Sequence, residues 1–224
     1  MSDLGLIIWD VDGTLVDSQA TIIAAMSQAF DAVGLAVPTD RDIRSIVGLS
    51  LERGFERLLP AADQHAISAL ADAYRRAYFE RRERLGTPGT SPFYPGIRPL
   101  LDRLHAMDRV LMAIATGKSR RGVDLLVQGH GLEGYFICRE TADTHPSKPH
   151  PSMILDILDQ TGLSPEAAVM VGDTSFDMDM ARAAGVRSIG VTWGYHRRDD
   201  LMADQIVEDI PDLTQALMTF LEAK

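Results

Sequence analysis

Two kinds of hydrophobic pattern alternate along most of this chain. Short continuous apolar runs predict buried strands, and longer segments with apolar residues three or four positions apart predict helices. The strands are predicted at 4–9, 110–115, 135–138, 168–171 and 186–191, and helices between them at 97–107, 120–129, 153–160 and 176–184. This alternation favours an α/β fold, in which helices cover both faces of a parallel sheet.

One long segment breaks the alternation. Between residues 17 and 90 the apolar residues recur at helical spacing, and helices are predicted at 21–33, 39–47, 51–59 and 63–85. This segment, the helical insertion, ends in a run of glycine and proline at 86–92 that predicts a linker. The chain is therefore expected to form a parallel-sheet core from 1–16 and 91–224, with a small all-helical domain at 17–90 inserted after the first strand.

Composition and charge narrow the choice of partners. The 224 residues are 46% hydrophobic and 24% charged, which is ordinary for a globular protein, and the net charge of −10 disfavours nucleic acid and anionic membranes. No apolar segment is long enough to span a membrane, and the first residues lack the basic start of a signal peptide. The single cysteine, Cys138, cannot form an internal disulfide. A cytoplasmic protein is expected, either a monomer or a homodimer.

Two carboxylates directly follow the first predicted strand. Side chains alternate in an extended backbone, so Asp10 and Asp12 can start on the same side. Two neighbouring carboxylates both stay ionised only if a cation or strong donors lie between them. Gly13 then allows a sharp turn. This arrangement suits a divalent metal and a phosphorylated substrate.

Polar residues follow two other predicted strands, and a lysine lies in a loop between them. Thr116 and Gly117 stand at a helix start, where free N–H groups attract anions. Lys148 is stiffened by neighbouring prolines, and Asp173 and Asp177 follow the strand at 168–171. Because the carboxyl ends of parallel strands share one edge of the sheet, these groups are expected to form one site with Asp10 and Asp12.

Such a set of residues suits phosphoryl transfer. Asp10 would attack phosphorus and form an aspartyl-phosphate that water later hydrolyses. Asp12 would protonate the leaving oxygen and then take a proton from the attacking water. Mg²⁺, held by Asp10, the backbone carbonyl of Asp12 and Asp173, would offset the repulsion between carboxylate and phosphate.

The remaining residues would bind and orient. Thr116, Gly117 and Lys148 are expected to hold the phosphoryl oxygens. Asp177 would steady either the waters of the metal or Lys148. Each of these residues alone has an ordinary structural explanation, since a threonine often caps a helix and a lysine often lies on a surface loop. Their occurrence together favours the catalytic interpretation.

Four short motifs carry a resemblance to a known family. They are Asp10-x-Asp12-Gly13-Thr14, Thr116 after a strand, Lys148-Pro149 and Gly172-Asp173-x-x-x-Asp177. In this order they resemble the motifs of the haloacid dehalogenase-like hydrolases, and the opening at 12–18 is similar to that of the phosphoglycolate phosphatase-like branch. The resemblance implies a Rossmann-like core, a mobile helical cap over the site, and Mg²⁺-dependent hydrolysis of a small phosphorylated metabolite.

The resemblance also suggests where the substrate is selected. In similar phosphatases the part of the cap that corresponds to 44–53 faces the substrate, so Arg44, Gly48, Ser50 and Arg53 are the specificity candidates. Either arginine could bind a substrate carboxylate through two parallel hydrogen bonds. Helix arginines more often lie on solvated faces.

The first candidate substrate is 2-phosphoglycolate, with inorganic pyrophosphate, a nucleotide or a sugar phosphate as alternatives within the family. A function of another class is a non-catalytic regulatory module that binds a phosphorylated ligand. Such a module would normally have lost Asp10, Asp12 or Lys148, and all three are present. A dinucleotide-binding domain would need a glycine-rich loop after the first strand, which Gly13 alone does not provide.

Overall fold

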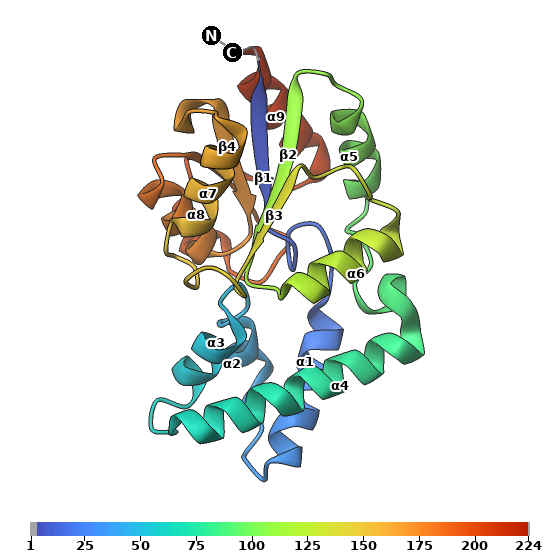
Figure 1. Ribbon diagram of the computed structural model, residues 1–224, viewed down its shortest axis with the longest axis vertical. Helices are drawn as coiled ribbons and strands as arrows, with labels where there is room; N and C mark the ends of the chain where they lie inside the picture. The colour runs from blue at the N-terminus through green and yellow to red at the C-terminus, as the bar shows by residue number, and fades with distance from the viewer. Residues whose placement is uncertain (1–3, 224) are drawn as a thin grey trace.

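The core of the protein is a six-stranded parallel sheet. A computed structural model describes residues 4–223, and its strands run in the order β3-β2-β1-β4-β5-β6 (Figure 1). The strands are β1 (Gly5–Trp9), β2 (Val110–Thr116), β3 (Cys138–Thr141), β4 (Ala168–Gly172), β5 (Arg187–Val191) and β6 (Gln205–Val207). Because all neighbours pair in parallel, the carboxyl ends of the strands meet at one edge. The predicted α/β class and parallel sheet are confirmed.

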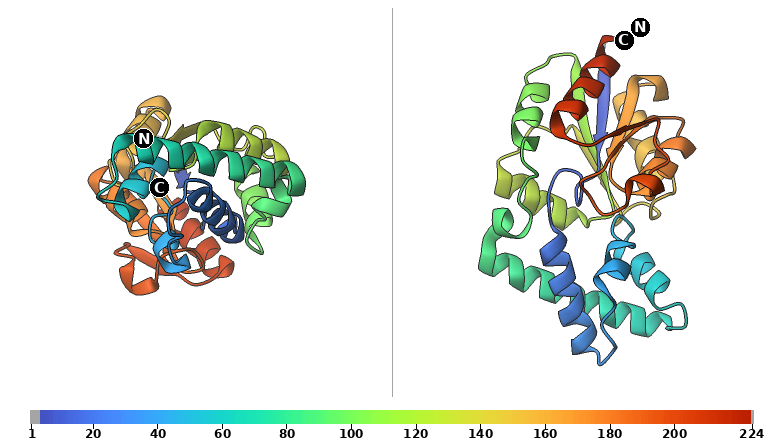
Figure 2. Two further views of the ribbon diagram at one scale, coloured as in Figure 1. Left: turned by 90° about the horizontal axis from the view of Figure 1, so that it is seen from below. Right: turned by 180° about the vertical axis from the view of Figure 1, so that it is seen from behind.

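Helices cover both faces of this sheet. They are α5 (Ile97–His105), α6 (Arg120–His130), α7 (Ser152–Thr161), α8 (Ser175–Ala183) and α9 (Ile210–Glu222), with short 3₁₀ turns at Pro165–Ala167 and Arg198–Asp200. Ile7 and Trp9 of β1 pack with α5, α6 and α9, whereas Leu6 and Ile8 pack with α7 and α8. Figure 2 shows α9 crossing β1 on the face turned away in Figure 1. Burial on both faces explains why β1 is apolar throughout.

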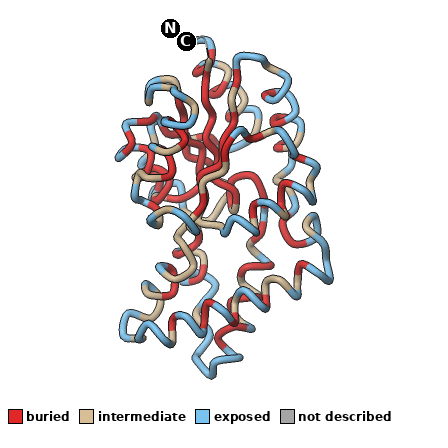
Figure 3. The backbone as a smooth tube through the Cα atoms, in the orientation of Figure 1, coloured by how far each residue is buried: buried red, intermediate tan, exposed pale blue. Residues whose placement is uncertain are grey.

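The helical insertion lies beyond the carboxyl ends of the strands. Its helices are α1 (Gln19–Ala32), α2 (Asp40–Arg44), α3 (Leu51–Leu58) and α4 (Gln64–Thr90). They enclose a third apolar cluster, in which the rings of Phe30 and Phe55 lie 6.1 Å apart edge to face. Figure 3 shows buried residues along α1 and α4 below those of the sheet. None of the helices in residues 4–223 has the length and apolar character that a membrane crossing requires.

The predicted linker at 86–92 is wrong in part. Gly86 has a φ of 72°, which ends the straight part of α4, and the chain then turns helically again as far as Thr90. Pro88 is tolerated because it lies in the first turn after the break, where its missing N–H costs no helical hydrogen bond. The oxygen of Thr90 accepts a hydrogen bond of 2.9 Å from the hydroxyl of Thr21, so the two connections to the core are tied together.

The predicted strand at 135–138 is also displaced. Tyr135 and Phe136 pack on the core beside α5 and α6, and β3 begins only at Cys138. The apolar run at 135–138 belongs mainly to a loop that packs on the core, whereas β3 itself is more polar. The pattern predicted nothing after residue 191, where the structure has β6 and α9.

Candidate active site

Three of the predicted residues lie at the carboxyl edge of the sheet. Asp10 follows β1, and its amide donates a hydrogen bond of 2.9 Å to the carbonyl of Val171 in β4. Thr116 is the last residue of β2, and Asp173 is the first residue after β4. These three residues are at most 1% exposed. Parallel pairing therefore brings two carboxylates and a hydroxyl to one buried edge.

Lys148 supplies a buried positive charge between two carboxylates. Its Nζ lies 2.6 Å from Oδ1 of Asp10 and 2.6 Å from Oδ1 of Asp177. Burial lowers the pKa of Lys148, but the two carboxylates together raise it more, so the pKa lies above its usual value. Oδ2 of Asp177 accepts hydrogen bonds from the amide and hydroxyl of Thr174 at 3.0 and 2.7 Å. Asp177 thus anchors Lys148 to the start of α8.

The carboxylates outnumber the lysine that they surround. Oxygen atoms of Asp10, Asp173 and Asp177 lie within 4.8 Å of one another. Burial, partly offset by Lys148, raises the pKa of Asp10 to about 6, and burial with two neighbouring carboxylates raises that of Asp173 well above its ordinary value. Oδ2 of Asp10 is buried and has no hydrogen-bond partner within residues 4–223. One ammonium group leaves this cluster negative, so its oxygens fit a divalent cation.

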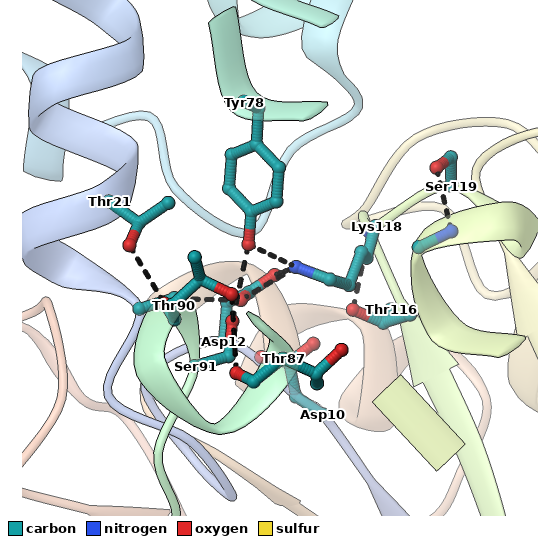
Figure 4. Close-up of polar contacts among 12 residues, drawn as sticks. Asp10, Asp12, Thr21, Tyr78, Thr87, Thr90, Ser91, Thr116, Lys118 and Ser119 are labelled. Carbon is teal, nitrogen blue, oxygen red and sulfur yellow. Dashed lines mark hydrogen bonds and ion pairs between the residues drawn. The ribbon is translucent and has the colours of Figure 1, made fainter. Parts of the chain in front are cut away.

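Asp12 does not contact Lys148 but has other polar partners. Its carboxylate accepts hydrogen bonds from Nζ of Lys118 at 2.8 and 2.9 Å and from the hydroxyl of Ser18 at 2.6 Å. The hydroxyl of Tyr78 lies 3.3 Å from the same ammonium group, and Figure 4 shows this tyrosine reaching from α4 towards the sheet edge. Burial lowers the pKa of Lys118, but Asp12 and Tyr78 raise it more, so the lysine stays charged. Sequence reasoning assigned Lys118 no role, although its position directly after Thr116-Gly117 indicated that it lies near the site.

The helical insertion meets the sheet edge at Gly117. A Cβ atom at this position would lie 2.5 Å from the carbonyl oxygens of both Gly48 and Leu49, which is closer than real Cβ atoms come. The amide of Ser50 donates a hydrogen bond of 2.8 Å to the hydroxyl of Ser147 in the core. Gly117 therefore permits the loop between α2 and α3 to rest directly on the loop after β2.

A cavity of about 270 Å³ lies between the sheet edge and the helical insertion. From the sheet edge its lining includes Asp10, Asp12, Thr116, Gly117 and Lys118, and from the insertion Ile22, Met26, Val47, Leu49, Tyr74 and Tyr78. Polar groups thus gather on one side of the cavity and mostly apolar groups on the other. Its volume suits a small metabolite.

The specificity candidates divide into two pairs. Among the described residues, the cavity lining includes Gly48 and Ser50 but neither Arg44 nor Arg53. The Arg53 side chain is 68% exposed and pairs with Glu56, and that of Arg44 is 42% exposed and faces Asp40 at 4.0 Å. The arginines that do line the cavity are Arg75 and Arg82 of α4 and Arg121 of α6. The sequence did not single out these three.

The sequence profile described as haloacid dehalogenase-like hydrolase matches residues 7–191. The chain belongs to this family. Among curated haloacid dehalogenase-like relatives, the "Probable phosphatase IndB" of Dickeya dadantii is 36% identical, over 91% of this chain and 89% of that protein. The phosphoglycolate phosphatase of Agrobacterium fabrum is 34% identical, over 98% of this chain and 94% of that protein.

Solved structures of the family have the same fold. A haloacid dehalogenase-like hydrolase from Streptococcus pneumoniae has a TM-score of 0.80 and 27% identity, over 98% of this chain and 99% of that one. A predicted phosphatase from Clostridium acetobutylicum has a TM-score of 0.85 and 24% identity, over 96% and 99%. The predictions of the family, of its Rossmann-like fold and of a phosphoric monoester hydrolase are confirmed.

Proposed function

We propose that this haloacid dehalogenase-like hydrolase cleaves a small phosphomonoester in two steps on Asp10. The main support is that Asp10 and Asp12 both line the cavity, with one lysine against each carboxylate. The first candidate substrate is 2-phosphoglycolate, because relatives from Agrobacterium fabrum and Vibrio cholerae are named phosphoglycolate phosphatase.

In the first step the Asp10 carboxylate attacks phosphorus, the ester P–O bond breaks, and Asp12 gives a proton to the leaving alcohol. In the second step a water molecule attacks phosphorus, Asp12 takes its proton, and the bond between Asp10 and phosphorus breaks to release phosphate. Ser18 and Lys118 hold the Asp12 carboxylate in place for both transfers.

Positive charge and hydrogen-bond donors would stabilise the transferring group. Thr116 and the amide of Gly117 lie before the start of α6, and Lys148 contacts the nucleophile itself. Mg²⁺ would be held by Asp10, Asp173 and the backbone carbonyl of Asp12. When bound, it would offset the repulsion between the Asp10 carboxylate and the phosphate.

Asp177 would orient the reacting groups without contacting the substrate. It holds Lys148 at 2.6 Å and the start of α8 through Thr174. From this position it would also steady the water molecules of the cation. Its role is therefore to position Lys148 and the start of α8.

Adding Mg²⁺ at roughly 100 times its dissociation constant is expected to raise the free energy of unfolding by about 2.7 kcal/mol near pH ~8. The gain should be smaller near pH ~5, because Asp10, with its pKa raised from 3.8 to about 6, then binds a proton that competes with the cation. Urea denaturation with Mg²⁺ or EDTA at both pH values measures it. An equal gain at both, or none, would contradict the assignment of the site.

In the metal-free protein the ionisation of Asp10 is expected to lower the free energy of unfolding as the pH rises. A buried acid whose pKa is raised on folding binds more protons in the folded state than in the unfolded state. The contribution of Asp10 is therefore fully present below pH 3.8 and is lost as the pH rises through about 6. The metal-free protein should accordingly lose stability across this range, and Mg²⁺ should restore it above the range.

We further propose that residues 17–90 act as a movable cap that closes on the loop after β2. Gly117→Ala is expected to lower kcat/KM by about 10- to 100-fold, because the new methyl group keeps Gly48 and Leu49 from seating. Steady-state kinetics measure the loss, and thermal melting checks that the fold is kept. Activity within twofold of wild type would show that closure at this contact does not matter.

Kinetics on a panel of phosphate esters test the proposed function. We expect turnover of 2-phosphoglycolate with Mg²⁺ and its loss with EDTA. A preference for pyrophosphate, a nucleoside monophosphate or a sugar phosphate would show that the proposed substrate is wrong and would leave the proposed reaction unchanged. Tight binding of these compounds without any turnover would contradict the reaction and favour a binding module.

A further inference from the structure

Arg82 is a buried arginine with donors that nothing in the described chain accepts. The residue is 8% exposed, and its Nε and Nη2 atoms are buried without a hydrogen-bond partner within residues 4–223. It lines the cavity from α4, and its Cζ lies 5.6 Å from the centre of the Tyr78 ring. Burying an unpaired charge is costly. Such a residue fits a ligand that supplies the missing acceptors.

The other cationic groups of the cavity already have partners. Arg75 bonds to Glu52 and Asp72. Arg121 is exposed, and its Cζ lies 4.4 Å from the centre of the Phe79 ring. Lys118 is occupied by Asp12. A new anion in the cavity would therefore find the free donors of Arg82.

The acidic groups of the cavity are likewise engaged. Their partners are Lys148 for Asp10, Lys118 for Asp12, Arg75 for Glu52 and the amide of Arg120 for Asp143. Within the described chain, the acidic side chains of the cavity therefore all have partners other than Arg82. Tyr78 connects it to the catalytic edge, since Nζ of Lys118 lies 5.1 Å from the same ring centre.

We propose that Arg82 binds a carboxylate of the substrate while the phosphate group lies against Asp10. This rests on the proposed function and narrows its substrate class to small phosphorylated hydroxycarboxylic acids. The planar guanidinium group presents donors in a fork that matches both oxygens of a carboxylate. Apolar residues that line the same cavity, such as Met26 and Val47, would strengthen the pair by excluding water. In this proposal Arg82 of α4, and not Arg44 or Arg53, binds the substrate carboxylate.

The test compares two esters that differ in the carboxylate. They are 2-phosphoglycolate and 2-hydroxyethyl phosphate, which has nearly the same size. In the full-length protein, Arg82→Gln should lower kcat/KM for 2-phosphoglycolate about 10- to 100-fold, mainly through KM, and change that for 2-hydroxyethyl phosphate less than about threefold. Arg82→Lys should recover part of the loss. Arg84→Gln, a matched change of an exposed arginine on the same helix, should alter neither.

Equal losses on both esters would show that Arg82 supports the fold or the catalytic edge and would overturn the proposal, as would no loss on either. A third ester, ethylene glycol bisphosphate, separates the two anions. If its hydrolysis depends on Arg82 and that of 2-phosphoglycolate does not, the assignment to a carboxylate is wrong.

Calorimetry separates this inference from the proposed function. In the Asp10→Asn background, 2-phosphoglycolate should bind with Mg²⁺, and adding Arg82→Gln should weaken binding about 10- to 100-fold. If the wild type turns over neither ester, the proposed reaction fails while this comparison still tests Arg82. Absence of binding, or binding unaffected by Arg82→Gln, would refute the carboxylate subsite.

Discussion

Asp10→Asn is expected to lower kcat by about 10⁴- to 10⁶-fold with the fold intact. The amide oxygen of asparagine is a poor nucleophile, so no aspartyl-phosphate forms, yet the side chain keeps its size. Lys148 retains its second partner, Asp177, at 2.6 Å. Burial raises the pKa of Asp10 to about 6, which means that its charge opposes folding at neutral pH in the metal-free protein. Removing that charge should not destabilise it.

Single-turnover and steady-state kinetics on the best ester of the panel measure this loss. Thermal melting and circular dichroism check the fold. Asp108→Asn is the matched control, because Asp108 is exposed in the turn before β2, at the opposite end of that strand from Thr116. Turnover of the Asp10 variant within tenfold of wild type would remove Asp10 as the nucleophile.

Lys148→Met should cost both stability and activity. The lysine is 1% exposed and pairs with two buried carboxylates. Breaking such a pair from one side usually costs about 3–5 kcal/mol, because the remaining charges stay buried without compensation. The loss of a charge that stabilises the transferring phosphoryl group should lower kcat/KM by at least about 10³-fold.

The pH dependence of this loss follows from its cause. Without Lys148 the carboxylates of Asp10, Asp173 and Asp177 repel one another. Protonation of Asp10, whose pKa is raised to about 6 by burial, relieves the repulsion at low pH. The difference in unfolding free energy from wild type should thus be largest above neutral pH and smaller near pH ~5. Lys118→Met is the comparison. Because Asp12, the partner of Lys118, is partly accessible to water, removing Lys118 should destabilise the protein less than removing Lys148. Similar losses for both variants at every pH would contradict the importance of the buried cluster.

The sequence was sufficient to predict that Asp10, Thr116 and Asp173 meet at one edge of the sheet. Asp10 and Asp173 directly follow apolar strands and Thr116 ends one, and parallel pairing leaves only one edge at which such residues can meet. Lys148 was harder, because it lies in a loop, and its two ion pairs depend on how that loop packs against α8. A lysine in a loop is more often a surface residue, so Lys148 was assigned to the site from the prolines around it and from the other site residues that accompany it.

The cavity side of the helical insertion could not be predicted in the same way. Arginines lie on all sides of α4, so the pattern does not say which of Arg75, Arg82 and Arg84 faces inward. That depends on the angle at which α4 crosses α1 and on the ring of Tyr78. Arg44 and Arg53 were chosen because the corresponding cap segment of similar phosphatases faces the substrate, yet among the described residues neither lines the cavity.

The end of the chain was missed for a different reason. β6 has only three residues, too few for an alternating pattern to be recognised. α9 does carry a usable signal, since Asp209 caps it, a proline stands in its first turn, and Leu213, Leu217 and Phe220 recur at helical spacing. This signal would have predicted the helix that covers the sheet face on which Ile7 lies.

The most direct test is to trap the covalent intermediate. Asp12→Asn should still allow Asp10 to take the phosphoryl group from p-nitrophenyl phosphate, whose good leaving group needs no acid, but should slow the attack of water. Rapid acid quenching and peptide mass spectrometry should then find about one phosphoryl group per chain, on Asp10. No label, or a label on any other residue, would contradict an enzyme that works through Asp10.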